Sequence, residues 1–465
     1  MRPSLRIALA GVTAGALVCV LASCSGSGSD TAADGTVTIT VSGRPPATNA
    51  AALKTFDARV AEFQKANPKI KIRTNEYQYD QQSFQTKVGG GSLETVVRVP
   101  LTEMSGLIKR RQIADLSSEF KALKHSEDFN DVALGPAKGV DGKLYGIPTE
   151  EYALGLVYNR DLFEKAGLDP DKPPASWSEV RTAAKAISEK TDATGYAQMT
   201  KENTGGWMLT AMAYSFGDSM QEESGGKWAN SFDRPGSGAE KSLKALKEMR
   251  WTDDSMGKNQ LRNITDMEKD FSAGKIGMTI AGPSMVGHYI QQYKGDPKTI
   301  GLGAMPVDGT SKRTLAGGTI AVISPRATEQ QREAAAKFID FYYLSTKYDA
   351  GLAEKDAVAK KKDGAAIGVP TVPFYKPAIA GPVQAAVGKQ ANVPVGNFAP
   401  YSSTLGDYEL AIEPPVEAQN VYKALDSAVQ AVLTREDADP AEQLKKAAAQ
   451  VESQVERAQN QHHAR

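Results

Sequence analysis

The side chains that most often carry out covalent catalysis are scarce in this chain. It has 465 residues, of which two are cysteine and four are histidine. Both cysteines, Cys19 and Cys24, lie near the N-terminus, so the rest of the chain has no thiol nucleophile and no cysteine ligand for a metal. Two histidines belong to a polar C-terminal tail, which leaves His125 and His288 for acid–base chemistry. The sequence therefore disfavours several classes of enzyme and predicts no metal or other cofactor.

Glutamates are the remaining side chains that could do chemistry. Glu150 and Glu151 are adjacent, and adjacent residues on an extended chain point to opposite faces. They cannot jointly flank one glycosidic bond, as the two carboxylates of a glycoside hydrolase must, so at most one of them serves a binding site. A hydrolase would instead need Glu103, which follows the third predicted strand, to face Glu151. Either carboxylate can also accept paired hydrogen bonds from the vicinal hydroxyls of a sugar.

Aromatic side chains offer a second kind of sugar contact. Trp207 follows two glycines that would expose its indole, and a flat ring can stack on the C–H face of a pyranose. Tyr401, in a loop-rich segment, is a weaker candidate for the same role. The sequence surroundings of Trp177, Trp228 and Trp251 favour packing instead.

Two glycine-containing turns could bring backbone close to a ligand. Gly282 and Ser284 stand between a predicted strand and a predicted helix, where free N–H groups and a hydroxyl can face a hydroxyl-rich or anionic ligand. The alternative is an ordinary helix that begins with a proline. Gly317 and Gly318, followed by Thr319, would let the backbone approach a ligand or a neighbouring lobe, or would simply form a tight turn.

The elements that must position these residues begin with a strand over 37–41. A helix is predicted over 50–66, a second strand starts at Ile70, and a third spans 95–99, which together indicate parallel strands in an α/β unit. Arg44 follows the first strand at the carboxyl edge of this sheet, where α/β folds place ligand contacts.

The N-terminus has the features of an export signal. Arg2 and Arg6 precede an apolar run of about 16 residues, which is short for a membrane span. The run ends in LASC at residues 21–24, which resembles the lipobox of bacterial lipoproteins, although a short membrane helix is an alternative. The resemblance implies cleavage after residue 23 and acylation of Cys24, with palmitate among the expected lipids. Residues 24–35 would then form a tether of about 20 Å.

The composition argues against nucleic acid as a partner and indicates an ordinary globular protein. Lysine plus arginine and aspartate plus glutamate each number 55, so the chain has no net positive charge with which to bind nucleic acid. Apolar residues make up 41 %, as in ordinary globular proteins, and the length predicts two to four lobes or domains.

One long segment carries a family resemblance. Residues 141–168, DGKLYGIPTEEYALGLVYNRDLFEKAGL, resemble the hairpin and crossing strand of the maltodextrin-binding-like solute-binding proteins of sugar-type ABC importers. Further matches occur in the family's order, and they are PPASWSEV near Pro173, FSAGKIGMTIAGPS from Phe271, LAGGTIAVISP from Leu315 and EAAAKFIDFYYLS from Glu333. The resemblance covers about residues 36–459. The chain departs from the family pattern at Leu93 and Glu94, where a Pro-Asp pair is usual.

The resemblance implies a two-lobed α/β fold of the type II periplasmic-binding-protein-like class, with discontinuous lobes and a central ligand cleft. Crossings between the lobes are expected near residues 151–157, after 282–284 and near Ser324. The implied division is a signal peptide over 1–23, a tether over 24–35, lobe one over 36–152 and 287–324, lobe two over 153–286 and 325–459, and a polar tail over 460–465.

The resemblance also implies a function. The chain is expected to be a lipid-anchored, monomeric binding protein on the extracytoplasmic face of a bacterial membrane, capturing a mono- or oligosaccharide and delivering it to an ABC transporter permease by lobe closure, without catalysis. Two alternatives stay open: an anchored glycan-acting hydrolase, and a binding protein for a peptide or polyamine. The expected ligand contacts are Arg44, Glu103, Glu151, Tyr152, Trp207, Gly282, Ser284, Gly317, Gly318, Thr319 and Tyr401, and the expected lipidation site is Cys24.

Overall fold

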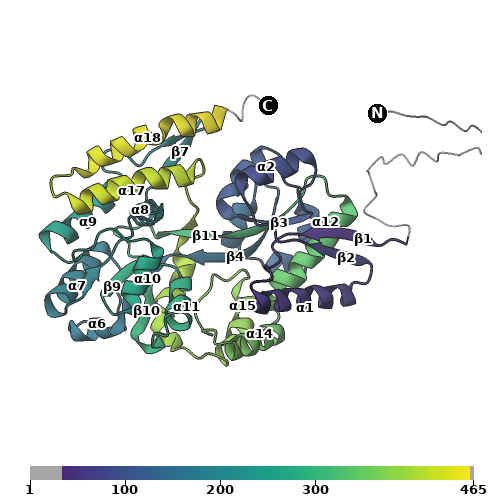
Figure 1. Cartoon of the computed structure of the whole chain (residues 1–465), viewed down its shortest axis with the longest axis horizontal. Coiled ribbons are helices and arrows are strands. Elements are labelled where there is room, and N and C mark those ends of the chain that lie inside the picture. The colour runs from purple at the N-terminus through teal and green to yellow at the C-terminus, as the bar shows by residue number, and fades with distance from the viewer. Residues whose placement is uncertain (1–33, 461–465) are drawn as a thin grey trace, which may run out of the picture.

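The computed structural model describes residues 34–460. The expected signal peptide, Cys24, almost all of the expected tether and residues 461–465 lie outside this range. Buried side chains form two separate hydrophobic cores. We call the part of the chain around the smaller core lobe one and the part around the larger core lobe two (Figure 1). Within the described residues no helix is both long enough and apolar enough to cross a bilayer.

Lobe one contains the predicted parallel strands. β1 (Val37–Val41) pairs with β2 (Ile70–Thr74) and with β3 (Val96–Pro100), both in parallel. The strand and helix predictions for residues 37–99 are confirmed, with the third strand shifted by one residue. α1 (Ala50–Ala66) begins at Asn49, whose side chain accepts a hydrogen bond from the Ala52 N–H, and ends before the Asn67–Pro68 pair.

Helices cover both faces of the lobe-one sheet. α2 (Gln81–Gly90) lies on the opposite side of the sheet from α1 (Figure 1). α12 (Glu329–Ile339) and the π-helical turn that follows it (Asp340–Leu344) pack on α1, with the Phe63 and Phe338 rings 5.3 Å apart. The short helices of this lobe are α3 (Met104–Lys109), α4 (Ser117–Lys121) and α5 (Asp131–Leu134).

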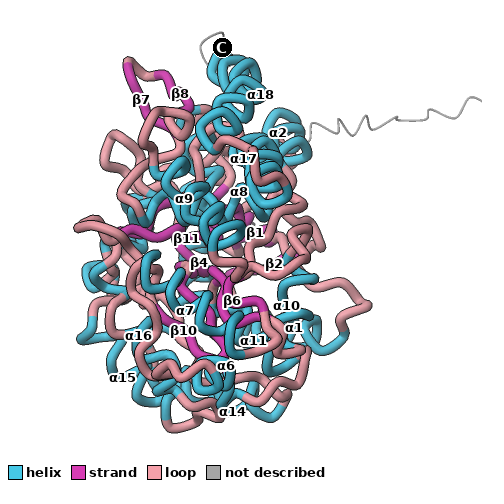
Figure 2. Tube along the Cα trace, turned by 90° about the vertical axis from the view of Figure 1, so that its left-hand side faces the viewer, coloured by secondary structure: helices cyan, strands magenta, loops and turns pink. Residues whose placement is uncertain are grey.

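Lobe two is built on a second sheet, in the order β10-β5-β9-β6. These strands are β5 (Gly155–Asn159), β6 (Thr194–Tyr196), β9 (Ile276–Ala281) and β10 (Ile300–Gly303). The surrounding helices are α6 (Arg160–Lys165), α7 (Trp177–Lys190), α8 (Thr204–Ser215), α9 (Gly238–Lys247), α10 (Ile264–Ser272), α11 (Pro283–Gln291), α17 (Ala418–Thr434) and α18 (Pro440–Asn460). α17 and α18 pair above α8 and α9, and the hairpin of β7 (Gln221–Ser224) and β8 (Lys227–Asn230) contacts α18 (Figure 2).

Two antiparallel strands connect the lobes. β4 (Ile147–Ala153) starts in the smaller core with Ile147 and ends in the larger core with Ala153. β11 (Arg313–Ile323) runs the other way, from Leu315 in the larger core to Ile320 in the smaller one. We call this pair the crossing ribbon. It spans the middle of the molecule in Figure 1.

A later segment also passes between the lobes. It contains α13 (Ser345–Tyr348), α14 (Ala350–Lys362), α15 (Pro377–Gly388) and α16 (Ala399–Ser402), followed by β12 (Glu409–Ala411). Val372 packs in the larger core and Phe374 in the smaller one, so this segment contacts both lobes. α14 and α15 lie below the crossing ribbon in the view of Figure 1.

The lobe boundaries differ from the expected ones. Residues 287–312 were expected in lobe one, but Tyr289 and Leu302 pack in the larger core because β10 pairs with β5. Residues 325–344 were expected in lobe two, but Phe338 packs in the smaller core because α12 lies on β1. The return to lobe one is made by β11 itself, and the chain leaves that lobe only after residue 344.

The crossing ribbon generates a prediction at Gly318. Its φ is +153°, and a Cβ there would lie 2.0 Å from the Glu150 carbonyl oxygen. Gly318→Ala should lower the free energy of unfolding by about 1 to 3 kcal/mol, because strained backbone and a backbone clash cannot be relieved by a side-chain rotation. Chemical denaturation measures this.

Gly89→Ala is the matched control, because Gly89 is exposed in α2 and a Cβ there meets nothing within 4 Å. It should be neutral or slightly stabilising. If Gly318→Ala unfolds at the wild-type denaturant concentration, the ribbon geometry described above is contradicted.

Candidate functional site

Several of the predicted residues meet where the ribbon passes between the two cores. The strand register sets Tyr152 opposite Gly317 and Glu151 opposite Gly318. The Tyr152 side chain lies across Gly317, since a Cβ there would be 2.3 Å from the Tyr152 hydroxyl oxygen. Gly282, the N-cap of α11, also borders Tyr152, because a Cβ built on it would lie 3.6 Å from the Tyr152 ring. Gly317 therefore makes room for the tyrosine rather than forming a simple turn, whereas a Cβ at Gly282 would be in ordinary contact with the ring.

Glu151 is a buried acid without a hydrogen bond. Both of its carboxylate oxygens are shielded from solvent, and neither has a partner within residues 34–460. Burial raises the pKa of Glu151 to about 8, an effect that the charge of Lys347 on α13 partly offsets. Burial also lowers the pKa of the Lys347 ammonium, which lies 4.3 Å from the centre of the Phe374 ring. Near neutral pH the Glu151 carboxyl therefore holds a proton that it can donate to a ligand oxygen.

The neighbouring Glu150 has different surroundings. It is mostly exposed and forms an ion pair with Arg98 of β3 at 2.9 Å. The same arginine donates to the Thr319 hydroxyl, which also lies 2.9 Å from the Thr149 hydroxyl. The two adjacent glutamates were predicted to point to opposite faces, and their different surroundings agree with this: Glu150 pairs with Arg98, whereas the Glu151 oxygens are shielded and have no partner among the described residues. The hydroxyl of Thr319, which was expected to contact the ligand, hydrogen-bonds instead to Arg98 and Thr149.

A second group of residues lies around Tyr152, and the sequence analysis found only part of it. β12 pairs in parallel with β11 and ends with Ala411 opposite Leu315, and Glu413 follows two residues after the end of β12. The Glu413 carboxyl has a pKa raised to about 7, first by burial and then by the negative charge of Glu103. Burial and then the charge of Glu413 raise the pKa of Tyr152 to about 12.

Two further tyrosines complete this group. The Tyr214 hydroxyl donates to the Ile412 carbonyl at 2.8 Å, next to Glu413. Tyr422 of α17 is 1 % exposed, and its hydroxyl has no partner among the described residues. We refer to Glu103, Tyr152, Tyr214, Glu413 and Tyr422 as the acid–tyrosine cluster. No local motif marks Glu413, Tyr214 or Tyr422, because strand pairing and helix packing bring them together over long stretches of sequence.

Three other predicted residues lie elsewhere. The Arg44 guanidinium is paired with Asp57 of α1 through two hydrogen bonds of 3.1 and 2.8 Å. Tyr401 is 1 % exposed and donates to the Ala153 carbonyl at 2.9 Å, so it packs in the larger core instead of offering an open ring. Ser284 is exposed in the first turn of α11.

Trp207 lies in the first turn of α8, half-buried against the larger core. The two glycines before it do not serve mainly to expose the indole. A Cβ at Gly206 would lie 2.3 Å from the Tyr422 carbonyl oxygen, so this glycine allows α8 to approach α17 closely. Asp426 of α17 accepts hydrogen bonds from the N–H groups of Asn203 and Gly206 and so caps α8.

Two of the other three tryptophans, Trp177 and Trp251, make hydrogen bonds within lobe two that account for them as packing residues. Trp177 is buried and donates to the Ser215 hydroxyl at 2.8 Å. Trp251 donates to the Val432 carbonyl at 2.9 Å. Trp228 differs, because the Lys109 ammonium of lobe one lies 6.0 Å from the centre of its ring.

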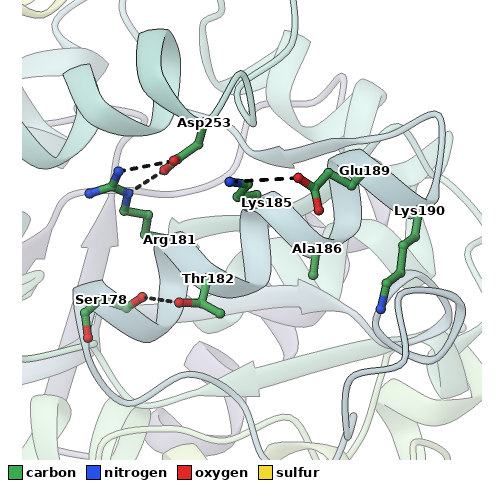
Figure 3. A pocket seen from close by; sticks show the side chains of 8 residues that line it. All are labelled: Ser178, Arg181, Thr182, Lys185, Ala186, Glu189, Lys190 and Asp253. Carbon is green, nitrogen blue, oxygen red and sulfur yellow. Dashed lines mark hydrogen bonds and ion pairs between the residues drawn. The ribbon is translucent and has the colours of Figure 1, made fainter.

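One hollow on the described part of the chain is lined by residues of α7 and by Asp253, and by none of the residues described above. It has a volume of about 550 Å³ and lies along α7 (Figure 3). Arg181 faces Asp253 across it, and Lys185 faces Glu189 at 3.9 Å. The remaining lysine of the lining, Lys190, donates to the Ala166 carbonyl at 2.6 Å, and no residue of the crossing ribbon lines the hollow. We do not place the functional site there.

Comparison with known proteins gives a family match. The model of a family described as bacterial extracellular solute-binding proteins matches residues 47–347. A Brucella abortus protein, named for binding but with no ligand given, is 31 % identical over 232 residues, which is 49 % of this chain and 52 % of that protein. The chain therefore spans about half the length of the curated relatives it matches first.

Two further matches concern proteins with named ligands. The lactose-binding protein of Rhizobium radiobacter is 25 % identical over 281 residues, or 56 % of this chain and 62 % of that protein. The crystal structure of the cyclic α-maltosyl-1,6-maltose binding protein of Arthrobacter globiformis superposes with a TM-score of 0.69 at 19 % identity, over 91 % of this chain and all of that one. The fold is thus that of the two-lobed maltose-binding type.

The buried Glu151 carboxyl generates a prediction about pH. Its pKa is about 8 in the folded chain and 4.5 in a free side chain, so between these values only the unfolded chain loses the proton. The folded state binds more protons there, and the free energy of unfolding must fall as pH rises. Glu151→Gln removes this effect, so the stability of the variant relative to wild type should grow between about pH 5 and 8 by on the order of 3 kcal/mol and then level off.

Urea titrations at pH 5, 7 and 9 measure the difference. Glu436→Gln, the same change at an exposed position, should show a constant difference from wild type across this range. A constant difference for Glu151→Gln as well would show that Glu151 is ionised in the folded protein at neutral pH.

Proposed function

This chain belongs to the bacterial extracellular solute-binding proteins, and on that premise we propose that it binds a saccharide between its two lobes and delivers it to the permease of an ABC transporter. The observation that carries the proposal is the group of buried polar side chains at the junction of the two cores. Glu151 has two shielded oxygens without a partner, and Tyr422 has a shielded hydroxyl without one. Such groups are costly unless something hydrogen-bonds to them, and a polyhydroxylated ligand would do so.

The lobes would act as a clamp. Glu103 comes from lobe one, Trp207 and Ser284 come from lobe two, and Tyr152 belongs to the ribbon between them. A ligand that touches both lobes binds the closed arrangement more tightly than the open one, and only this difference in affinity can shift the population. The permease would then recognise the closed form. No bond is made or broken in this cycle.

A saccharide fits the chemistry of the junction. A protonated carboxyl such as Glu151 donates one hydrogen bond and accepts others, which matches the donor and acceptor pattern of sugar hydroxyls. Tyrosine side chains offer both a hydroxyl and an apolar ring. The names of the lactose-binding and maltosyl-maltose-binding proteins support the same ligand class.

The hydrolase alternative receives less support. It requires Glu103 to face Glu151, but the charge of Glu103 acts on Glu413, whereas the charged group acting on Glu151 is Lys347. A pair of carboxylates able to act as acid and nucleophile must flank one bond.

The proposal includes a lipid anchor. Cys24 would carry the acyl groups and hold the binding lobes at the outer face of the cell membrane, as a monomer on a short tether. Cys24 lies outside the described residues, so this step is supported by the LASC sequence alone. Mass spectrometry that finds Cys24 unmodified in the mature protein would contradict the anchor.

Calorimetric titration with a panel of mono- and oligosaccharides tests the function. We expect saturable binding of at least one saccharide, and chromatography of the mixture after prolonged incubation should return that saccharide intact. Binding followed by shorter products would support the hydrolase instead. Failure of every saccharide to bind, with binding of a peptide or polyamine, would contradict the sugar assignment.

Trp207→Ala tests the stacking contact from lobe two. Loss of a stacked ring should weaken saccharide binding by roughly ten- to hundredfold, since it removes about 1 to 3 kcal/mol of binding free energy. Trp251→Ala is the control, because that indole is also half-buried but bonds to α17 on its own side of lobe two. It should lower the melting temperature and leave the affinity unchanged. If Trp207→Ala behaves like Trp251→Ala, Trp207 is a packing residue only.

A further inference from the structure

The chain makes an unusual turn just before the helix that carries Trp207. Glu202 and Asn203 both have left-handed backbone, with φ of +59° and +68°. Residues other than glycine adopt this conformation at a cost in free energy, although asparagine tolerates it better than most. Among residues 34–460, no other two non-glycine residues with positive φ are adjacent. Such a pair persists only where the surrounding structure holds it in place.

The residues that follow this turn do little by themselves to fix a helix start. Gly205 and Gly206 lie in the first turn of α8, and glycine is a poor helix former. Packing requires both of them. A Cβ at Gly205 would lie 2.8 Å from an Asp426 carboxylate oxygen, and one at Gly206 would lie 2.3 Å from the Tyr422 carbonyl oxygen. Trp207 therefore needs other contacts to hold it in one place.

Hydrogen bonds from α17 and α10 hold the turn. The buried Asp426 carboxylate of α17 accepts from the Asn203 N–H at 2.7 Å. The Asn203 amide donates to the side chain of Gln419, also on α17, at 3.0 Å. From the other side, Asn263, the N-cap of α10, donates to the Glu202 carboxylate at 2.9 Å. The left-handed conformation is thus fixed by groups from two other helices.

The turn is joined directly to Trp207. The Asn203 carbonyl accepts the hydrogen bond of the Trp207 N–H at 3.1 Å. The backbone conformation of Asn203 therefore sets where α8 begins, and with it the point from which the half-buried indole extends.

We infer that Glu202 and Asn203 are positioning residues for Trp207: their left-handed turn fixes the indole in the orientation on which a saccharide ring stacks. This inference rests on the proposed function and on the stacking contact within it. A ring that is already ordered before the ligand arrives loses less conformational entropy on binding, and the affinity is higher for that reason. Neither residue has to touch the ligand.

Matched substitutions separate the backbone conformation from the side chains. Asn203→Val and Asn203→Gly both remove the bond to Gln419, but only glycine adopts a positive φ without cost. Calorimetric titration uses whichever of lactose, maltose and maltotriose wild type binds most tightly. Asn203→Val should bind it roughly three- to tenfold more weakly, and Asn203→Gly should stay within about twofold of wild type. Glu202→Val and Glu202→Gly give the same comparison at an exposed residue if Asn203→Val does not fold.

Lys294→Val is the control for strain alone. Lys294 is exposed in lobe two, beyond the C-terminal end of α11, and its φ is +57°. Valine there should lower the melting temperature, as at Asn203, and leave the affinity unchanged. The loss of affinity caused by Asn203→Val should also vanish in the Trp207→Ala background, because a residue that acts through the indole has no effect once the indole is absent.

Fluorine NMR follows the ring without a ligand. In protein labelled with 5-fluorotryptophan, the Trp207 resonance is identified by its absence from Trp207→Phe. It should shift or broaden in Asn203→Val and stay unchanged in Lys294→Val. The resonances of the other tryptophans should stay in place in both variants.

The outcomes separate this inference from the function it rests on. Wild-type affinity in Asn203→Val, an equal loss in Asn203→Gly, or a loss of the same size in the Trp207→Ala background overturns the positioning role and leaves a saccharide-binding protein. An unchanged Trp207 resonance in Asn203→Val overturns it whether or not a saccharide binds. Absence of binding by every saccharide to wild type contradicts the proposed function instead.

Discussion

The pairing of β4 with β11 is the constraint on which the rest of the structure depends. Each strand begins in one hydrophobic core and ends in the other, so the same hydrogen-bonded ladder belongs to both lobes. The middle of this ribbon has two glycines opposite Tyr152 and Glu151, because no larger residue fits there. The site is therefore built on strands that belong to both lobes, and the proposed closure would have to leave their pairing intact. Strands that run through both lobes can twist without losing their pairing, which suits a clamp.

Buried acids at this junction are a second recurring feature. Glu151 and Glu413 lie on strands or strand ends whose neighbours are apolar or aromatic, and both carboxyls resist ionisation. Unpaired polar groups of this kind reduce stability, and proteins keep them mainly where a ligand satisfies them. Lys347 accompanies one acid and no cation accompanies the other.

The elements that could be predicted from the sequence are those fixed by residue alternation and helix-end signals within a short stretch of chain. The first three strands and α1 follow from alternating residues and from the Asn49 and Asn67–Pro68 signals. The resemblance placed one crossing near residues 151–157, close to β4, and named Glu151, Tyr152, Gly317 and Gly318 as contacts, but it set all of β11 in lobe one and predicted no pairing of β11 with β4. Long-range packing could not be predicted in the same way. The lobe boundaries failed because the pairing of β10 with β5 has no local signal. Glu413 and Tyr422 were missed for that reason too, and the glycines before Trp207 were misinterpreted because their contact is with α17.

Closure of the lobes about the crossing ribbon is the central claim, and small-angle X-ray scattering tests it most directly. The radius of gyration should be measured without ligand and with a saccharide that calorimetry has shown to saturate the protein. The account predicts a decrease on saturation, because a ligand bound to both lobes stabilises the closed arrangement. An unchanged scattering profile at proven saturation would contradict it.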